Sequence, residues 1–343
     1  MRDVELKGLP HWLRMMVLAT MVILGATPAW SDDAARAAAV RKALGDWMTA
    51  HEVGNATVTF FHRGKVISTQ RLGAKPADQL SLASLSKVIT GMCLFKLEQK
   101  GLVAQSTRLV EIFGPGLGKL EIDAPAYEDL TIAELLTHTA GLAPDSTQPR
   151  MPKWIGSDRD RHERISRHAL SRHTQEGKRG QYRYNNENYA ILGAVIEQIT
   201  GQEYAIVCHE ALFDGGGYPS ARLSAKWGAY AAWGGWEMTG DDFAKFLWEQ
   251  LGPATDYGKN PKGHAHTTLV EGVYYGHGTL FRQSEKHRNF WHHGALCFPG
   301  VESLGSFFAF WRGGYGVVVG YDKCPPNQMM IDLDLALGRA VFQ

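Results

Sequence analysis

The segment ASLSKVITGM, residues 83–92, stands where a strand-like part of the chain gives way to a helical one. It holds the only Ser-x-x-Lys sequence in the protein, with Ser84 and Lys87 at its ends. Three residues turn a helix through about 300°, so these two side chains share one face, one turn apart. The start of a helix also supplies backbone N–H groups and the positive end of its dipole. A nucleophile at Ser84 would therefore have a base and oxyanion donors close by.

Ser84 and Lys87 also admit a structural interpretation, in which the serine caps the helix and the lysine points into water. A lysine with the ordinary pKa near 10.4 is almost entirely protonated at pH 7. Catalysis therefore needs burial and polar neighbours that lower its pKa by about 3. Two further polar segments could supply such neighbours, Tyr184-Asn185-Asn186 and His292-His293-Gly294.

Strand-like sequences lie near both ends of the chain, and helical sequences lie between them. Residues 56–72 predict a β-hairpin, because β-branched and aromatic runs flank Arg63-Gly64. The other expected strands cover 272–282, 290–293, 303–311 and 315–321. The expected helices cover 85–100, 131–137, 188–200, 241–251 (with Asp241 as its N-cap) and 328–342.

This order predicts an α+β protein with one antiparallel sheet built from both ends of the chain, flanked by helices and interrupted by a mainly helical insertion. We place the sheet domain at residues 32–82 and 272–343 and the helical domain at 83–271. The active site is expected between the two domains.

The first 31 residues are typical of an export signal. Arg2, Lys7 and Arg14 are followed closely by the apolar run 15–26, and Ala29-Trp30-Ser31 forms a small-x-small cleavage site. A transmembrane helix needs about 20 apolar residues, so an uncleaved membrane anchor is the less favoured alternative. We therefore expect a periplasmic or secreted protein without a stable membrane span.

The overall charge disfavours nucleic acid as a partner. The chain has 36 Lys and Arg against 35 Asp and Glu, a formal charge of +1. The basic stretch 159–183 is interleaved with Asp160, Glu163 and Glu176, which is typical of a solvated helix face.

Four cysteines could form disulfides in an oxidising compartment, and three pairing schemes are possible. We favour a bond between Cys297 and Cys324, which flank the strand-rich C-terminal region. Cys93 and Cys208 lie in helical patterns and are expected to be buried free thiols. No Cys/His spacing indicates a zinc site.

Three short motifs, Ser84-x-x-Lys87, Tyr184-x-Asn186 and His292-x-Gly294, follow one another along the chain. Together they resemble the motifs of the serine β-lactamase and penicillin-binding protein family, in the branch of class C β-lactamases, DD-carboxypeptidases, D-aminopeptidases and esterases. The sequences LLTHTAGL (135–142) and YNNENYAILGAVIE (184–197) also resemble that family. No Gly-x-Ser-x-Gly occurs, which argues against an α/β-hydrolase.

The resemblance implies an acyl-enzyme mechanism without metal or organic cofactor. Ser84 would attack the carbonyl of an amide or ester, in a small molecule or a peptide. Lys87 and Tyr184 would share the proton transfers, and which of them is the base stays open. Asn186 would orient the substrate amide and Lys87. Taken alone, Tyr184 could equally be a core residue and Asn186 a helix N-cap.

The third motif bears on the oxyanion hole and on the substrate. The backbone N–H groups of Ser84 and of Ala295, which follows Gly294, would form the oxyanion hole. His292 would hold the Tyr184 hydroxyl or a substrate carboxylate, although a purely structural histidine is as common. Class C β-lactamases usually have Lys-Thr-Gly here, so we expect a DD-carboxypeptidase-, D-aminopeptidase- or esterase-like enzyme. A class C-like β-lactamase and a non-catalytic penicillin-binding module are the alternatives.

Two other features are expected to be structural. Trp227, Trp233, Trp236 and Trp248 crowd the region before the third motif, where core packing is favoured over a pocket lining. His138 lies within the LLTHTAGL segment and resembles a structural element of the family.

Overall fold

The computed structural model describes residues 33–157, 161–172, 177–285 and 287–343. The export signal expected at residues 1–31 lies outside this part of the chain, as do two portions of the basic stretch 159–183.

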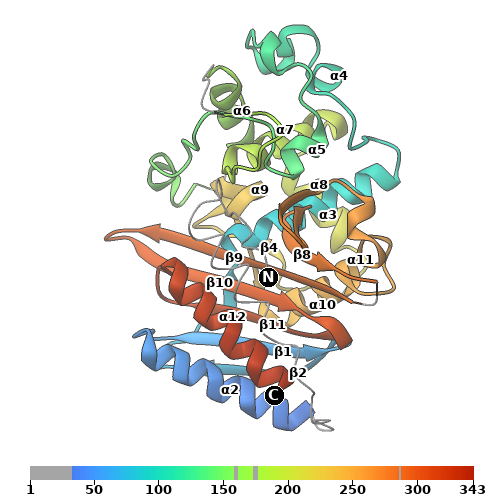
Figure 1. Cartoon of the computed structure of the whole chain (residues 1–343). Helices are drawn as coiled ribbons and strands as arrows, with labels where there is room; N and C mark the ends of the chain where they lie inside the picture. Colours follow the sequence, from blue (N-terminus) through green and yellow to red (C-terminus); the bar gives the residue numbers. More distant parts are fainter. Residues whose placement is uncertain (1–32, 158–160, 173–176, 286) are drawn as a thin grey trace.

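An eight-stranded antiparallel sheet dominates the fold, in the order β2-β1-β11-β10-β9-β8-β7-β6 (Figure 1). Since β1 pairs with β11, both ends of the chain build one sheet, as predicted. Its strands are β1 (Ala56–His62), β2 (Lys65–Leu72), β6 (Thr267–Val270), β7 (Val273–Gly276), β8 (Thr279–Gln283), β9 (Arg288–Phe298), β10 (Glu302–Phe310) and β11 (Tyr315–Tyr321). The protein is thus an α+β protein, and β6 joins the sheet ahead of the boundary predicted at residue 272.

Two helices, α2 (Asp33–Ala50) and α12 (Asn327–Phe342), lie side by side on one face of the sheet (Figure 1). The indole N–H of Trp47 in α2 donates to the Met329 carbonyl of α12 at 3.0 Å. Helix α2 was not predicted, because alanines fill much of its sequence and weaken the apolar stripe. Its buried residues nevertheless follow helical spacing, at Ala37, Val40, Leu44, Trp47 and Met48.

The opposite face carries the larger hydrophobic core, whose central helix is α3 (Ser86–Gln99). Around it lie α4 (Leu109–Phe113), α5 (Ile132–Leu136), α6 (His162–Leu170), α7 (Asn186–Thr200), α8 (Tyr204–Leu212), α9 (Ala231–Gly234), α10 (Gly240–Leu251) and α11 (Asp256–Lys259). A small unpredicted sheet combines β3 (Gln79–Ser81), β5 (Trp236–Thr239) and β4 (Arg222–Leu223). Within the described residues, no helix combines the length and apolar character needed to cross a bilayer.

Two predicted helix caps were wrong by one or two residues. The N-cap of α10 is Thr239, whose hydroxyl accepts from the Asp242 amide, and not Asp241. Asp241 instead accepts hydrogen bonds from the hydroxyls of Thr59 and Thr69, which attaches α10 to the main sheet. Likewise α7 begins at Asn186, two residues earlier than predicted, and its N-cap is the preceding residue, Asn185.

All four cysteines form disulfides. The predicted bond between Cys297 and Cys324 is confirmed. The expectation of free thiols was wrong for Cys93 and Cys208, which are bonded to each other. Helices α3 and α8 pack together and bring these two Cα atoms to 5.2 Å, although 115 residues separate them in the sequence. The helical pattern predicts that each cysteine is buried, but not which helix it faces.

The two disulfides are expected to differ in their contribution to stability. Removing the Cys93–Cys208 bond with paired alanine substitutions frees a loop of 115 residues, against 27 for Cys297–Cys324. The loss in free energy of unfolding should be about 2 to 5 kcal/mol, and about 1 kcal/mol larger for the longer loop. Urea unfolding of both double variants measures this. Alkylation of Cys93 and Cys208 in the unreduced, denatured protein, located by peptide mass spectrometry, would contradict the bond between them.

Candidate active site

Ser84 lies in a short 3-10 turn, η1 (Ala83–Leu85), directly before α3. The residue ahead of it, Ala83, is buried and has a left-handed backbone conformation with φ of 48°. Such a conformation is strained for a residue with a Cβ atom. The turn is held in place by β10, because the Ser306 hydroxyl donates to the Leu82 carbonyl at 2.7 Å. Ser84 is thereby placed at a pocket wall.

Lys87 is fully buried one turn after Ser84. Its Nζ lies 3.2 Å from Ser84 Oγ, 2.8 Å from Asn186 Oδ1 and 2.9 Å from the Trp233 carbonyl oxygen. Burial lowers the pKa of Lys87 from 10.5 to about 7, and the negative charge of Asp145 partly opposes this change. Charged and neutral forms of the amine are therefore both populated near neutral pH.

Tyr184 contacts both members of the first motif. Its side chain is hydrogen-bonded to that of Ser84, and its ring centre lies 4.9 Å from Lys87 Nζ. Removal from water raises the pKa of Tyr184, and the charge of Asp145 raises it further. The phenol therefore keeps its proton at neutral pH.

His292 is buried on β9 and is neutral. Its Nδ1 lies 2.6 Å from the His293 carbonyl oxygen, which can only accept, so Nδ1 carries the proton and Nε2 does not. Burial, together with nearby Lys87, lowers the pKa of His292 to about 3. Such an imidazole offers a hydrogen-bond acceptor and no positive charge, which disfavours the expected contact with a substrate carboxylate.

Gly294 brings β9 directly against the nucleophile. A Cβ atom added there would lie 2.9 Å from the Ser84 nitrogen and 2.7 Å from the Leu82 oxygen, and it would also clash with Ser306 Oγ. Strand β8 pairs with β9 only as far as Trp291. The part of β9 that carries the third motif is therefore not covered by β8.

A pocket of about 230 Å³ opens in front of Ser84. Among the described residues that line it, there is no Lys, Arg, Asp or Glu. The lining residues are Ser84, Gln148, Tyr182, Tyr184, Tyr275, Leu280, His292, His293, Gly294, Ala295, Asn327 and Met330. Lys87 and Asn186 are buried and do not line the pocket themselves. The sequence did not indicate the part played by Asn327 and Met330, because only the fold brings α12 to the site.

Two buried residues hold the second motif. The His138 carbonyl accepts from the Arg183 amide at 2.9 Å, and His138 Nδ1 accepts from the Asn185 amide at 3.3 Å, so both neighbours of Tyr184 are fixed. The His138 ring centre lies 4.5 Å from that of Tyr184. His138 thus has the structural place that was expected of it. The second residue, Thr147, accepts from Asn186 Nδ2 at 3.0 Å and had no sequence signal.

Three of the four tryptophans that precede the third motif lie in the protein core, and Trp248 packs against it partly buried. Trp227, Trp233 and Trp236 are almost completely buried, and none of them lines the pocket at Ser84. The core-packing interpretation is therefore confirmed for these three. Among the described residues, no group of three His, Cys, Asp or Glu side chains is placed to hold a metal ion.

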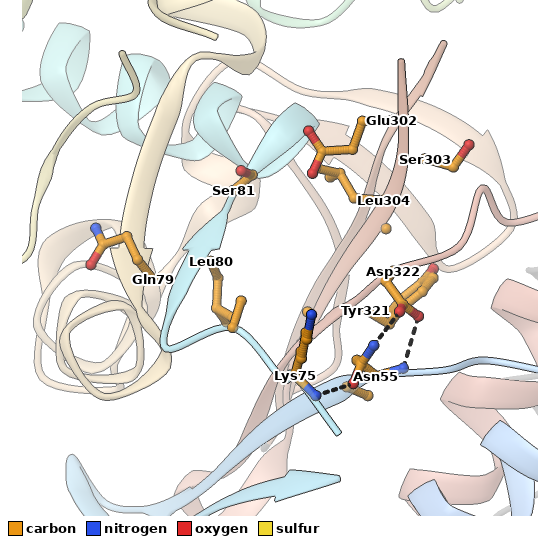
Figure 2. A pocket seen from close by; sticks show the side chains of 14 residues that line it. Asn55, Lys75, Gln79, Leu80, Ser81, Glu302, Ser303, Leu304, Tyr321 and Asp322 are labelled. Atoms are coloured by element: carbon orange, nitrogen blue, oxygen red, sulfur yellow. Dashed lines mark hydrogen bonds between the residues drawn. The ribbon is translucent and has the colours of Figure 1, made fainter. Parts of the chain in front are cut away.

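A second pocket, of about 250 Å³, lies at the end of the main sheet where β1, β10 and β11 meet the segment before β3. Figure 2 shows the Asn55 side chain between the Lys75 backbone and the Asp322 carboxylate, to which it is hydrogen-bonded at 2.6 Å on each side. None of the predicted site residues lines this pocket. We therefore take the pocket at Ser84 as the candidate active site.

Comparison with known proteins gives a consistent family. The Beta-lactamase family model matches residues 39–326. Penicillin-binding protein 4* of Bacillus subtilis (strain 168) is 26% identical over 186 residues, covering 52% of this chain and 36% of that protein. This chain thus spans little more than a third of that relative's length.

Two solved structures have closely similar folds. D-amino acid amidase from Ochrobactrum anthropi SV3 has a TM-score of 0.71 at 17% identity, and the match covers 89% of this chain and 99% of that one. Beta-lactamase/D-alanine carboxypeptidase from Pseudomonas syringae has a TM-score of 0.69 at 13% identity, with the same coverage. At such low identity, the likeness shows the fold.

Proposed function

Because the chain belongs to the Beta-lactamase family, we propose that it is an exported serine hydrolase that cleaves amide or ester bonds through an acyl intermediate on Ser84. One observation carries the proposal: the buried Lys87 amine lies 3.2 Å from the Ser84 hydroxyl oxygen and has a pKa of about 7. A base poised near the operating pH is what activation of a serine requires.

We propose Lys87, and not Tyr184, as the general base. Neutral Lys87 removes the proton of Ser84 as its oxygen attacks the substrate carbonyl. Tyr184, which is protonated at neutral pH, is hydrogen-bonded to Ser84. During the reaction it donates its proton to the leaving group. The backbone N–H groups of Ser84 and Ala295 bind the developing oxyanion. Water then attacks the acyl group. The Tyr184 phenolate takes a proton from this water, and the Lys87 ammonium returns a proton to Ser84 Oγ, so that both residues are restored.

The uncharged pocket favours a substrate without a carboxylate beside the scissile bond. The described residues of its lining offer no cation, and the pKa values of His292 and His293, lowered to about 3 by burial, leave both rings neutral. An aminopeptidase-, amidase- or esterase-like activity is therefore favoured over DD-carboxypeptidase or β-lactamase activity, in which the substrate carries a carboxylate. The fold shared with a D-amino acid amidase is compatible with this choice.

The test is covalent labelling of Ser84. The protein is incubated with an alkyl fluorophosphonate and analysed by intact-protein and peptide mass spectrometry, with p-nitrophenyl butyrate, D-phenylalanine amide, a D-alanyl-D-alanine peptide and nitrocefin as substrates. We expect one adduct on Ser84 and no adduct on the Ser84→Ala variant. The ester p-nitrophenyl butyrate or the amide D-phenylalanine amide should be hydrolysed faster than the D-alanyl-D-alanine peptide and nitrocefin, which both carry a carboxylate. Ser303→Ala, at an exposed serine of β10, is the matched control. An adduct that persists in Ser84→Ala would contradict the proposal.

A further inference from the structure

The hydroxyl of Thr147 has a fixed hydrogen-bond direction. Thr147 Oγ1 lies 2.7 Å from Asp145 Oδ1 and 3.0 Å from Asn186 Nδ2. A carboxylate oxygen only accepts, so the one hydroxyl proton of Thr147 points to Asp145. Thr147 therefore meets Asn186 as an acceptor, and the Asn186 atom that faces it must be the NH₂ group.

This direction decides which end of the Asn186 amide faces the base. With Nδ2 on Thr147, the carbonyl oxygen Oδ1 faces Lys87 Nζ at 2.8 Å. Oxygen and nitrogen of an amide are distinguished by their hydrogen-bond network, and here the network allows one assignment. Thr147 is fully buried and Asn186 is 4% exposed, so bulk water is not available to replace either partner.

The amide orientation sets the direction of the Lys87 lone pair. Neutral Lys87 has two N–H groups and one lone pair. Asn186 Oδ1 and the Trp233 carbonyl oxygen each accept one N–H, which leaves the lone pair for the third neighbour, Ser84 Oγ. If the amide were reversed, its NH₂ group would take the lone pair, and an N–H would face Ser84.

Asp145 is the fixed end of the hydrogen-bond series that runs through Thr147 and Asn186 to Lys87. Besides the Thr147 hydroxyl, its two carboxylate oxygens accept the backbone N–H of Thr147 at 2.8 Å and that of Asn186 at 3.0 Å. The carboxylate is thus tied to the first residue of α7, and cannot turn away from Thr147 without breaking these bonds.

We propose that Thr147, held by Asp145, is a positioning residue that orients the Asn186 amide so that the lone pair of Lys87 points at Ser84. The inference rests on the proposed function. Thr147 acts through Asn186 and does not contact the substrate in this role.

The test compares Thr147→Val, which keeps the side-chain shape without the hydroxyl, with Thr147→Ser, which keeps the hydroxyl. Both are assayed for fluorophosphonate labelling of Ser84 and for kcat/KM of the ester between pH 5 and 9. We expect Thr147→Val to lower the plateau rate by about 10- to 100-fold, the effect of losing one hydrogen bond to a charged or reacting group. Thr147→Ser should restore the rate to within about threefold of the unchanged protein.

The pH profile separates positioning from a purely structural role. In Thr147→Val the Asn186 NH₂ group can face Lys87, which disfavours the ammonium form, so the acidic limb should move to lower pH. Among the described residues, the titratable groups around Lys87 are Asp145, Tyr184, Tyr189, His138 and His292, and none of them is substituted in this variant. Thr57→Val, which removes an equally buried hydroxyl bonded to the Ala77 carbonyl, should leave the profile unchanged.

The outcomes are distinguishable. If the Thr147→Val variant is folded and its pH profile of kcat/KM has the same plateau and the same acidic limb as the unchanged protein, the inference is overturned and the proposed function stands. A lower plateau with no movement of the limb, or failure of Thr147→Ser to restore the rate, also overturns it. Absence of labelling and turnover in the unchanged protein contradicts the proposed function itself.

Discussion

Replacement of Lys87 by methionine is expected to lower kcat/KM for ester hydrolysis by about 10⁴-fold, comparable to losing a member of other serine-hydrolase triads. Methionine is close to lysine in length, and the site is fully buried, so the fold should accept it. The variant loses the amine that lies 3.2 Å from Ser84 Oγ and thus the acceptor for its proton. Steady-state kinetics with p-nitrophenyl butyrate measures the loss. Lys42→Met, at an exposed lysine of α2, is the matched control.

The unchanged protein should show the titration of this same amine. The pKa of Lys87 lies at about 7, and only its neutral form accepts a proton. The value of kcat/KM should therefore be low below pH 7, rise as the pH increases through about 7, and reach a plateau above it. Lys87→Arg should be inactive throughout, because a guanidinium keeps its charge at every usable pH. A flat profile between pH 5 and 8 would show that Lys87 is not the base.

Gly294→Val is expected to lower kcat by about 100- to 1,000-fold, the typical effect of losing an oxyanion donor. The first atom of any side chain here meets the Leu82 oxygen at 2.7 Å and the Ser84 nitrogen at 2.9 Å. Both are backbone atoms, so β9 must move away from η1. That movement separates the amide of Ser84 from that of Ala295.

A comparison of kcat with the thermal midpoint distinguishes this local effect from unfolding. Gly215→Ala is the control, because a Cβ atom there meets nothing within 4 Å. Gly294→Ala should already show a large part of the loss, since the clash begins at Cβ. Retention of more than about a tenth of the activity in Gly294→Ala would mean that β9 and η1 can move apart without loss of the oxyanion donors, which contradicts this prediction.

The sequence predicted the sheet well because its strands carry their own signal. In β1, Val58 and Phe60 face α2 and α12, while Thr59 faces α10, and this alternation is visible without the structure. Three motifs likewise predicted which residues surround Ser84. The first lies in the turn before α3, the second at the start of α7, and the third in the interior of β9, which continues beyond the strand end predicted at residue 293. Their catalytic roles remain the subject of the experiments above.

Several other contacts between distant segments were not predicted. The small sheet of β3, β5 and β4 has strands of only two to four residues, too short for a periodic pattern. The Cys93–Cys208 bond depends on how α3 and α8 pack. Thr147 is an ordinary threonine in a Pro-containing loop until the fold places it between Asp145 and Asn186.

The pairing of β1 with β11 also bears on how this protein folds. Asn55 and Asp322, at the start of β1 and the end of β11, are hydrogen-bonded although they are 267 residues apart. Until β11 arrives, the β1–β2 hairpin keeps a free edge, and closing so long a loop is slow. Folding should therefore be limited by this late closure, with the exposed edge available for aggregation in the meantime. Conditions that protect strand edges during refolding should raise the yield of native protein.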